Sequence, residues 1–134
     1  QMRLYASIHQ KIGDNFGVVT SYDGYDEISL TSEFKIVTKL YERVYTPVEM
    51  GLRYTTREEL YGGNAPEEAA AIFDSVLEGT STLSQKNVVI ANAACGISIM
   101  DKNLSMSETV EIARESLESG KALECFRRFL NINS

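Results

Sequence analysis

The chain has 134 residues, of which 43% are hydrophobic and 24% charged, so it can build one globular domain and is not a disordered chain. Its formal net charge is −6 and its basic residues are scattered, which argues against nucleic acid, because phosphate recognition needs a basic face. The sequence carries neither a signal peptide nor an apolar run of the roughly 18 residues that cross a bilayer. We therefore expect a cytoplasmic protein without a nucleic-acid or membrane partner.

The first part of the chain contains one helical pattern, which is followed by several short extended patterns. The opening pattern repeats apolar residues at helical spacing and stops at Gly13, which predicts a helix. The later segments are rich in β-branched and aromatic residues, with Asp23 and Gly24 as turn residues, which predicts strands. We place the turn of a β-hairpin near Tyr41 and Glu42. The expected helix and four strands cover residues 2–12, 16–22, 27–31, 34–41 and 43–46.

The middle of the chain turns helical. A short helix capped by Thr55 or Thr56 is expected to run to Tyr61. Pro66 suits the first turn of a longer helix, and Gly79 is its natural end. Apolar residues at helical spacing predict a core-facing stripe on this longer helix, made of Ala69, Ile72, Phe73, Val76 and Leu77.

The last part of the chain contains the most apolar segment. Residues 85–100 are apolar nearly all round, which indicates a helix buried on most sides, although a strand at residues 88–90 is the competing interpretation. We expect that this chain alone does not supply all the cover that the segment needs. Ser105 and Glu108 form a capping box that opens the final helical stretch, which Gly120 breaks or bends. The whole order predicts an α/β fold with an α+β-like sequence of elements: a mixed sheet of about four strands with four to five helices.

A cluster of carboxylates lies between two of the expected strands, at Asp23, Asp26 and Glu27. Loops at strand ends are where open sheets bind ligands. Carboxylates are hard oxygen ligands that suit Mg²⁺, which fills the rest of its shell with water and substrate phosphates. A run of Ser, Asp, Gly and Tyr between strands is also typical of a solvated turn, and from the charge pattern alone that is the simpler interpretation.

Other candidate residues are weaker. His9 is the only histidine and no nucleophile motif accompanies it, so we interpret it as a helix-surface or packing residue. Residues 62–64 (Gly-Gly-Asn) precede the helix opened by Pro66 and could present free N–H groups to an anion, although a helix stop followed by a cap is the simpler interpretation. Cys95 and Cys125 are the only cysteines and lack metal-site spacing, so we expect two reduced, buried thiols.

Several segments together resemble one family. Residues 23–31 read DGYDEISLT and are similar to the D-G-x-D-E-I-S-L-T segment of the anthranilate phosphoribosyltransferases. Further segments follow in the same order with compatible spacing, at residues 58–63, 70–79, 88–94 and 113–123. The resemblance covers essentially residues 3–130. It implies that residues 1–134 form a C-terminal part of the α/β domain in this nucleoside phosphorylase/phosphoribosyltransferase family, with the family's N-terminal helical domain absent and the α/β domain incomplete.

The resemblance also implies a reaction. Members of the family transfer a phosphoribosyl group from phosphoribosyl diphosphate to anthranilate and release pyrophosphate, in tryptophan biosynthesis. By resemblance, Asp26 and Glu27 would hold a Mg²⁺ cofactor against the diphosphate. Asp23 would help to position these ligands without binding the ion itself. It assigns no catalytic residue to this chain. Full-length members are homodimers through a region that has no counterpart here, so the oligomeric state is not carried over.

The departures from the family pattern limit what this chain can do. The family's glycine-rich G-T-G-G-D loop, its Lys-His-Gly-Asn segment and its upstream arginine are missing, and Ala69 stands where the family often has Asn. Gln1 reads as a cut end, and we expect the chain alone to be inactive. Two alternatives stay open. One is an enzyme like the pyrimidine nucleoside phosphorylases, and the other is a non-catalytic module that associates with a chain carrying the missing half.

Overall fold

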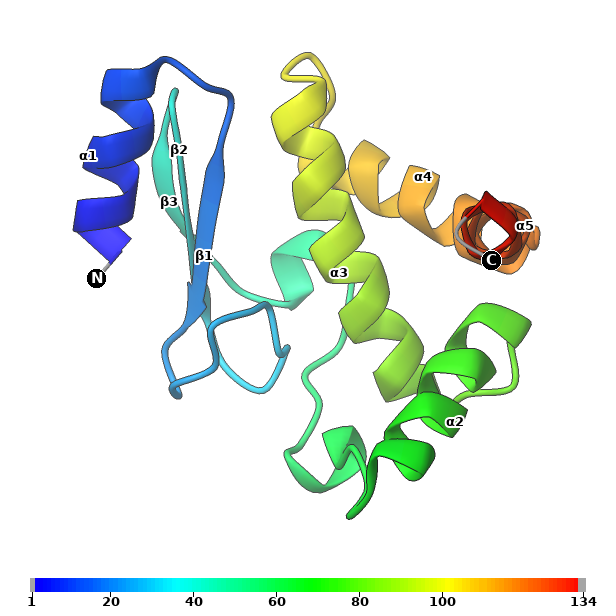
Figure 1. The fold of residues 1–134 in the computed structure, drawn as a ribbon. Helices are drawn as coiled ribbons and strands as arrows, with labels where there is room; N and C mark the ends of the chain where they lie inside the picture. Colours follow the sequence, from blue (N-terminus) through cyan, green and yellow to red (C-terminus); the bar gives the residue numbers. More distant parts are fainter. Residues whose placement is uncertain (1, 133–134) are drawn as a thin grey trace.

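The computed structural model in Figure 1 describes residues 2–132, and Gln1 lies outside this range. Three strands follow the first helix, and the second half of the chain is helical (Figure 1). The elements are α1 (Met2–Ile12), β1 (Gly17–Ser21), β2 (Phe34–Thr38), β3 (Glu42–Tyr45), the 3-10 helices η1 (Val48–Met50) and η2 (Glu58–Leu60), α2 (Pro66–Glu78), α3 (Leu83–Met100), α4 (Met106–Glu118) and α5 (Lys121–Ile132).

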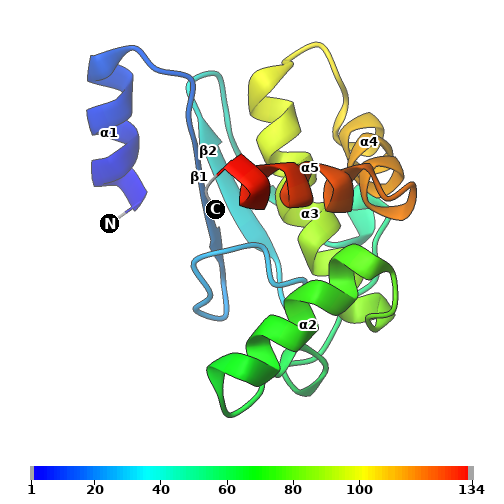
Figure 2. The same ribbon diagram turned by 45° about the vertical axis from the view of Figure 1, so that its right-hand side comes forward.

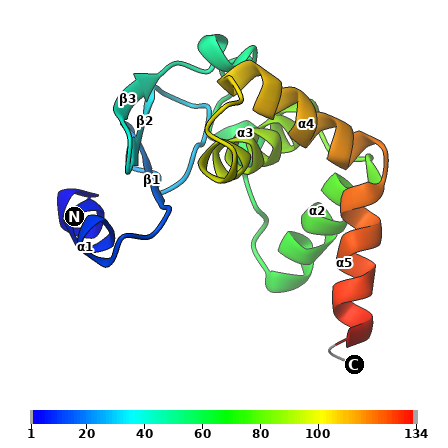
Figure 3. The same cartoon turned by 90° about the horizontal axis from the view of Figure 1, so that it is seen from above.

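The strands form one antiparallel sheet in the order β1-β2-β3. Val19 lies opposite Ile36, and Lys35 lies opposite Val44. α1 lies on one side of this sheet and α3 on the other (Figures 1 and 3). The expected α/β content and helix count are confirmed, but the expectation of four strands in a mixed sheet is wrong for the described residues, which form three antiparallel ones.

The segment expected as a further strand, residues 27–31, does not pair with the sheet. Its backbone leaves extended geometry at Leu30, where φ is 61°. The hairpin turn also falls earlier than expected, because Thr38 already donates its N–H to the carbonyl of Tyr41 at 2.8 Å. In both places, the hydrogen bonds of the backbone N–H and C=O groups are made with a side chain or within a turn, and not with a neighbouring strand.

α3 runs through the centre of the molecule, between the sheet and α4 (Figure 1). Thr82 and Gln85 form a capping box at its start, which confirms a helix and excludes the strand at residues 88–90. Its opposite side leaves Val89 and Met100 exposed, so the chain does not cover this apolar helix completely, as expected. The core on its buried side consists of Ile28, Leu30, Phe34, Ile36, Tyr45, Met50, Leu52, Val76, Ile90, Ala91, Ala94, Cys95, Val110, Ala113 and Leu117.

The apolar stripe of α2 is covered only in part, with Ile72 and Leu77 half-buried and Leu77 packed against the core. Only Val76 is buried, while Ala69 is exposed and Phe73 is 49% exposed. The main neighbour of α2 among the long elements is α5, which lies beside it (Figures 2 and 3) and has no buried residue of its own. Phe73 meets Phe126 of α5 edge-on at 5.1 Å between ring centroids.

The C-terminal helices meet at Gly120, as predicted. Its φ of 82° ends α4 and redirects the chain into α5. The capping box of Ser105 and Glu108 is also confirmed. Of the two free thiols, Cys95 is buried, which raises its pKa to about 11, but Cys125 is exposed, so the expectation of two buried thiols holds for one only. Among the described helices, none is long and apolar enough to cross a membrane.

Candidate functional site

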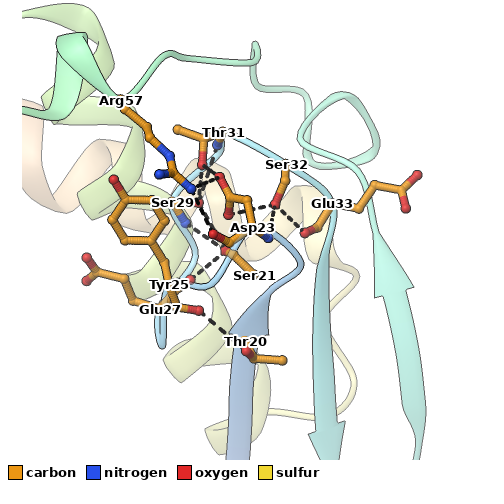
Figure 4. A network of polar contacts seen from close by, with 10 residues as sticks. All are labelled: Thr20, Ser21, Asp23, Tyr25, Glu27, Ser29, Thr31, Ser32, Glu33 and Arg57. Atoms are coloured by element: carbon orange, nitrogen blue, oxygen red, sulfur yellow. Dashed lines mark hydrogen bonds and ion pairs between the residues drawn. The ribbon is translucent and has the colours of Figure 1, made fainter.

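The carboxylate cluster lies on the loop that connects β1 to β2 (Figures 1 and 4). The loop begins with a tight turn, in which Gly24 donates its N–H to the carbonyl of Ser21 at 3.2 Å. Gly24 has a φ of 104°, which a residue with a side chain rarely adopts. At its far end, Tyr22 donates its N–H to the carbonyl of Glu33 at 2.9 Å, which closes the loop above the sheet.

A chain of hydroxyl groups fills the inside of this loop (Figure 4). The buried hydroxyl of Ser21 donates to the carbonyl of Glu27 at 2.7 Å and accepts from the Ser29 hydroxyl at 3.0 Å. The hydroxyls of Ser29 and Thr31 lie 2.7 Å apart, and Thr31 donates to Asp23 Oδ2 at 2.5 Å. Buried polar groups need such partners, so the network fixes one loop conformation.

Asp23 anchors this network and is fully engaged by it. Its carboxylate accepts from the hydroxyls of Thr31 and Ser32, and the Arg57 guanidinium lies 3.9 Å from Oδ2. Arg57 also donates to the Asp23 carbonyl at 2.8 Å. Burial acts to raise the pKa of Asp23, but these hydrogen bonds and the Arg57 charge outweigh it and hold the pKa below its usual value. Its contacts suit a supporting position better than that of a metal ligand.

Asp26 and Glu27 differ from Asp23 in their exposure and in the contacts of their carboxylates. Both residues are exposed, and neither carboxylate makes a hydrogen bond or ion pair with another described residue. The Glu27 side chain is directed away from the hydroxyl network (Figure 4). The two carboxylates are therefore available to a ligand on a backbone that the rest of the loop holds in place.

The backbone after Glu27 is held by distant parts of the chain. Ile28 donates its N–H to Asn92 Oδ1 at 3.0 Å, and Asn92 Nδ2 donates to the Ile28 carbonyl at 2.8 Å. Leu30 is fully buried in a left-handed conformation, and its carbonyl accepts the Thr55 N–H at 3.0 Å. Such strained residues persist only where surrounding contacts fix them, and they concentrate at functional sites.

The donor set, two exposed carboxylates, is compatible with Mg²⁺. Within residues 2–132, no three His, Cys, Asp or Glu side chains lie close enough together to hold an ion. A zinc site built from three or four such ligands is therefore absent among these described residues. Two free carboxylates instead match the usual protein share of a magnesium site, since Mg²⁺ completes its octahedron with water and phosphate oxygens.

The weaker sequence candidates serve other purposes. His9 stacks on Phe16 at 5.5 Å between ring centroids, which confirms a packing role. The N–H of Asn64 donates to Glu68 Oε2 at 2.7 Å, so the chain's own carboxylate occupies the proposed anion position before α2. Sequence reasoning missed Asn92 and Arg57. An amide in the most apolar part of a helix was the available signal for Asn92, whereas Arg57 carried none.

Comparison with known proteins places the chain in a family. Residues 1–123 match the family described as "Glycosyl transferase family, a/b domain". The chain is 52% identical over 134 residues to the anthranilate phosphoribosyltransferase of Phocaeicola vulgatus, covering 100% of this chain and 40% of that protein. It is 49% identical over 126 residues to the enzyme of the same name from Cytophaga hutchinsonii, covering 94% of this chain and 38% of that protein.

Solved structures of enzymes with the same name have a similar fold. The anthranilate phosphoribosyltransferase of Thermus thermophilus is 30% identical with a TM-score of 0.87, over 97% of this chain and 39% of that one. The Saccharomyces cerevisiae enzyme, solved in complex with PRPP and Mg, has the same fold at 20% identity and a TM-score of 0.83, over 97% of this chain and 38% of that one. The chain thus spans about 40% of the length of the curated relatives. From the match of its residues 1–123, the chain belongs to the glycosyl transferase family with this a/b domain.

Proposed function

We propose that this chain is part of an anthranilate phosphoribosyltransferase, which transfers the phosphoribosyl group of phosphoribosyl diphosphate to anthranilate and releases pyrophosphate. The observation that carries the proposal is the pair of unpartnered carboxylates, Asp26 and Glu27, on an immobilised loop. Relatives that are 52% and 49% identical to this chain bear the enzyme's name, and the yeast structure was solved with PRPP and Mg. We place the reaction in tryptophan biosynthesis and the protein in the cytoplasm, where its free thiols, Cys95 and Cys125, stay reduced.

In this mechanism the residues of the chain act on the leaving group. Asp26 and Glu27 would hold Mg²⁺ at the diphosphate, and Asp23 would keep their loop in shape. A magnesium ion bound there supplies positive charge that stabilises the negative charge growing on pyrophosphate as the C1–O bond breaks. The electrostatic gain is largest if the two carboxylates are already oriented before substrate arrives, because no reorganisation is then needed during the reaction.

We propose further that the chain alone is inactive. It provides two ligands of one ion and none of the family's glycine-rich phosphoribosyl loop. An assay of the isolated chain with anthranilate, phosphoribosyl diphosphate and Mg²⁺ should therefore give a rate equal to the blank. Turnover clearly above the blank would show that the chain carries a complete site.

The ion site can be tested on the chain itself with Mn²⁺ as a paramagnetic substitute for Mg²⁺. In ¹H–¹⁵N spectra, Mn²⁺ should broaden the amide signals of Asp26 and Glu27 first, and added Mg²⁺ should reverse the effect. The double variant Asp26→Asn/Glu27→Gln should abolish this local broadening. The matched control is Asp74→Asn/Glu78→Gln, which removes the same two charges from the exposed face of α2. Broadening that survives the first double variant would exclude the pair as the ion site.

A further inference from the structure

We infer that Asn92 is a positioning residue for the proposed ion site: its side-chain amide fixes the peptide unit that follows Glu27 and thereby sets the direction in which the Glu27 side chain leaves the backbone. The inference rests on the proposed function and assigns a role in it to a residue of α3 that lies 64 positions away from the loop in sequence. Asn92 contacts no carboxylate and does not act on substrate, so its effect passes entirely through the backbone.

The amide of Asn92 takes the place of a neighbouring strand. In an antiparallel sheet, a residue can exchange both its N–H and its C=O with one partner residue. Ile28 exchanges both groups with the single amide of Asn92, at 3.0 Å and 2.8 Å. The Ile28 side chain is fully buried in the core, so the backbone is held on one side by packing and on the other by hydrogen bonds.

The peptide unit between Glu27 and Ile28 is held at both ends. Its carbonyl oxygen, on Glu27, accepts the Ser21 hydroxyl at 2.7 Å, and its N–H, on Ile28, donates to Asn92. Ser21 belongs to β1 and Asn92 to α3, so the sheet and the central helix each hydrogen-bond to one end of this planar peptide unit. Rotating this plane would break both bonds, and the Glu27 side chain leaves the backbone at the atom next to it.

The orientation of the Asn92 amide is itself determined. Its Nδ2 donates to the Ile28 carbonyl and also to the Val88 carbonyl one turn earlier in α3, at 2.9 Å. A flipped amide would turn its oxygen toward these two carbonyl groups and lose all three hydrogen bonds. Leucine has nearly the same shape and cannot form any of them. Asn92→Leu therefore removes the hydrogen bonds while it keeps the branching of the side chain, although its two methyl groups are larger than the oxygen and NH2 group that they replace.

The experiment measures backbone opening and ion affinity in the same variants. Asn92→Leu should accelerate hydrogen exchange of the Ile28 amide at least about tenfold in the metal-free chain. It should also weaken Mn²⁺ binding, followed through the Asp26 and Glu27 amide signals, by about tenfold. The matched control is Asn87→Leu. Asn87 is buried on the same helix, but its Oδ1 has no partner and its side chain makes no hydrogen bond with the loop, so neither quantity should change.

A second variant approaches the same peptide unit from the sheet side. Ser21→Ala removes the hydroxyl that holds the Glu27 carbonyl, and it should weaken Mn²⁺ binding in the same direction. All measurements are made at a temperature where circular dichroism shows each variant folded. A purely structural role would lower the unfolding temperature and leave the ion affinity of the folded protein unchanged. If Asn92→Leu proves unfolded, Ser21→Ala still tests whether fixing the Glu27–Ile28 peptide unit affects ion binding.

The outcomes separate this inference from the proposed function. Wild-type affinity in folded Asn92→Leu or Ser21→Ala, with broadening at Asp26 and Glu27 intact, overturns the positioning role and leaves the ion site standing. Absence of any such broadening in the unmodified chain overturns the ion site and, with it, the role of Asn92.

Discussion

The carboxylate of Glu59 accepts the hydroxyl of Thr55 at 2.8 Å, four residues before it in the chain. Its other oxygen accepts from Arg53 at 3.0 Å and from the buried Ser84 hydroxyl of α3 at 3.0 Å. One carboxylate thus ties η2 and the segment before it to the start of the central helix. The Thr55 hydrogen bond, together with those from the Thr56 N–H and Ser84, lowers the pKa of Glu59 to about 2.

This depressed pKa makes stability depend on pH. The pKa of Glu in an unfolded chain is about 4.3. Because the folded pKa of Glu59 is lower, ionisation of Glu59 favours the folded state. The stabilisation is fully present above that unfolded value and is lost as the pH falls from about 4.3 toward the folded pKa of about 2. Glu59→Gln should therefore lower the melting temperature at pH 7, and its difference from wild type should shrink below pH of about 4. Glu58→Gln is the control, since its exposed side chain makes none of these contacts. A pH-independent difference for Glu59→Gln would contradict this assignment.

The proposed function predicts that Asp26 and Glu27 control the rate of the complete enzyme when magnesium is scarce. Asp26→Asn combined with Glu27→Gln should cut turnover strongly at limiting Mg²⁺, because the diphosphate leaving group loses its counter-ion. Steady-state rates measured over a range of Mg²⁺ concentrations, beside the Asp74→Asn/Glu78→Gln control, provide the check. Equal rates in the two double variants would remove the pair from the mechanism.

Gly17, the first residue of β1, lies against Ile99 of α3 so closely that a β-carbon added there would meet Cδ1 of the isoleucine. Gly17→Ala should therefore push the tip of the Ile99 side chain aside and destabilise the fold by up to about 1 kcal/mol, the low end of the range for overpacking. Ile99→Val removes that terminal carbon, so the double variant should be less destabilised than the sum of the two single ones. Thermal or urea unfolding of the four proteins measures this coupling, and strictly additive effects would show that the contact does not matter.

Ser105 caps α4 through the N–H of Glu108, and Glu108 reaches back to the N–H of Ser105. Ser105→Ala removes the acceptor for one helix N–H and should cost about 1 kcal/mol of unfolding free energy. Ser105→Asn retains an acceptor at the same position and should unfold close to wild type. Urea unfolding distinguishes the two variants, and equal losses for both would mean that the cap contributes little.

Local signals predicted the helices of this fold well. The capping box of Ser105, the first-turn proline of α2 and the break at Gly120 all depend on neighbours within one turn. Residues 27–31 alternate like a strand, yet they are not one, because their partner is the amide of Asn92 on a distant helix. The motif identified Asp26 and Glu27 as candidates, but only the fold shows their carboxylates free and Asp23 engaged. The predicted stripe of α2 is covered only in part, because sequence spacing says which residues share a face and not what covers that face.

α5 has no buried residue and follows directly after the left-handed turn at Gly120. Its two adjacent arginines, Arg127 and Arg128, are trypsin cleavage sites on a helix held mainly by its contacts with α4 and α2. Protease attack on a folded protein begins where the least free energy is needed to open the backbone. Trypsin should therefore trim this end first and leave a resistant product that ends at Arg127 or Arg128, a few residues beyond the end of the family match at residue 123.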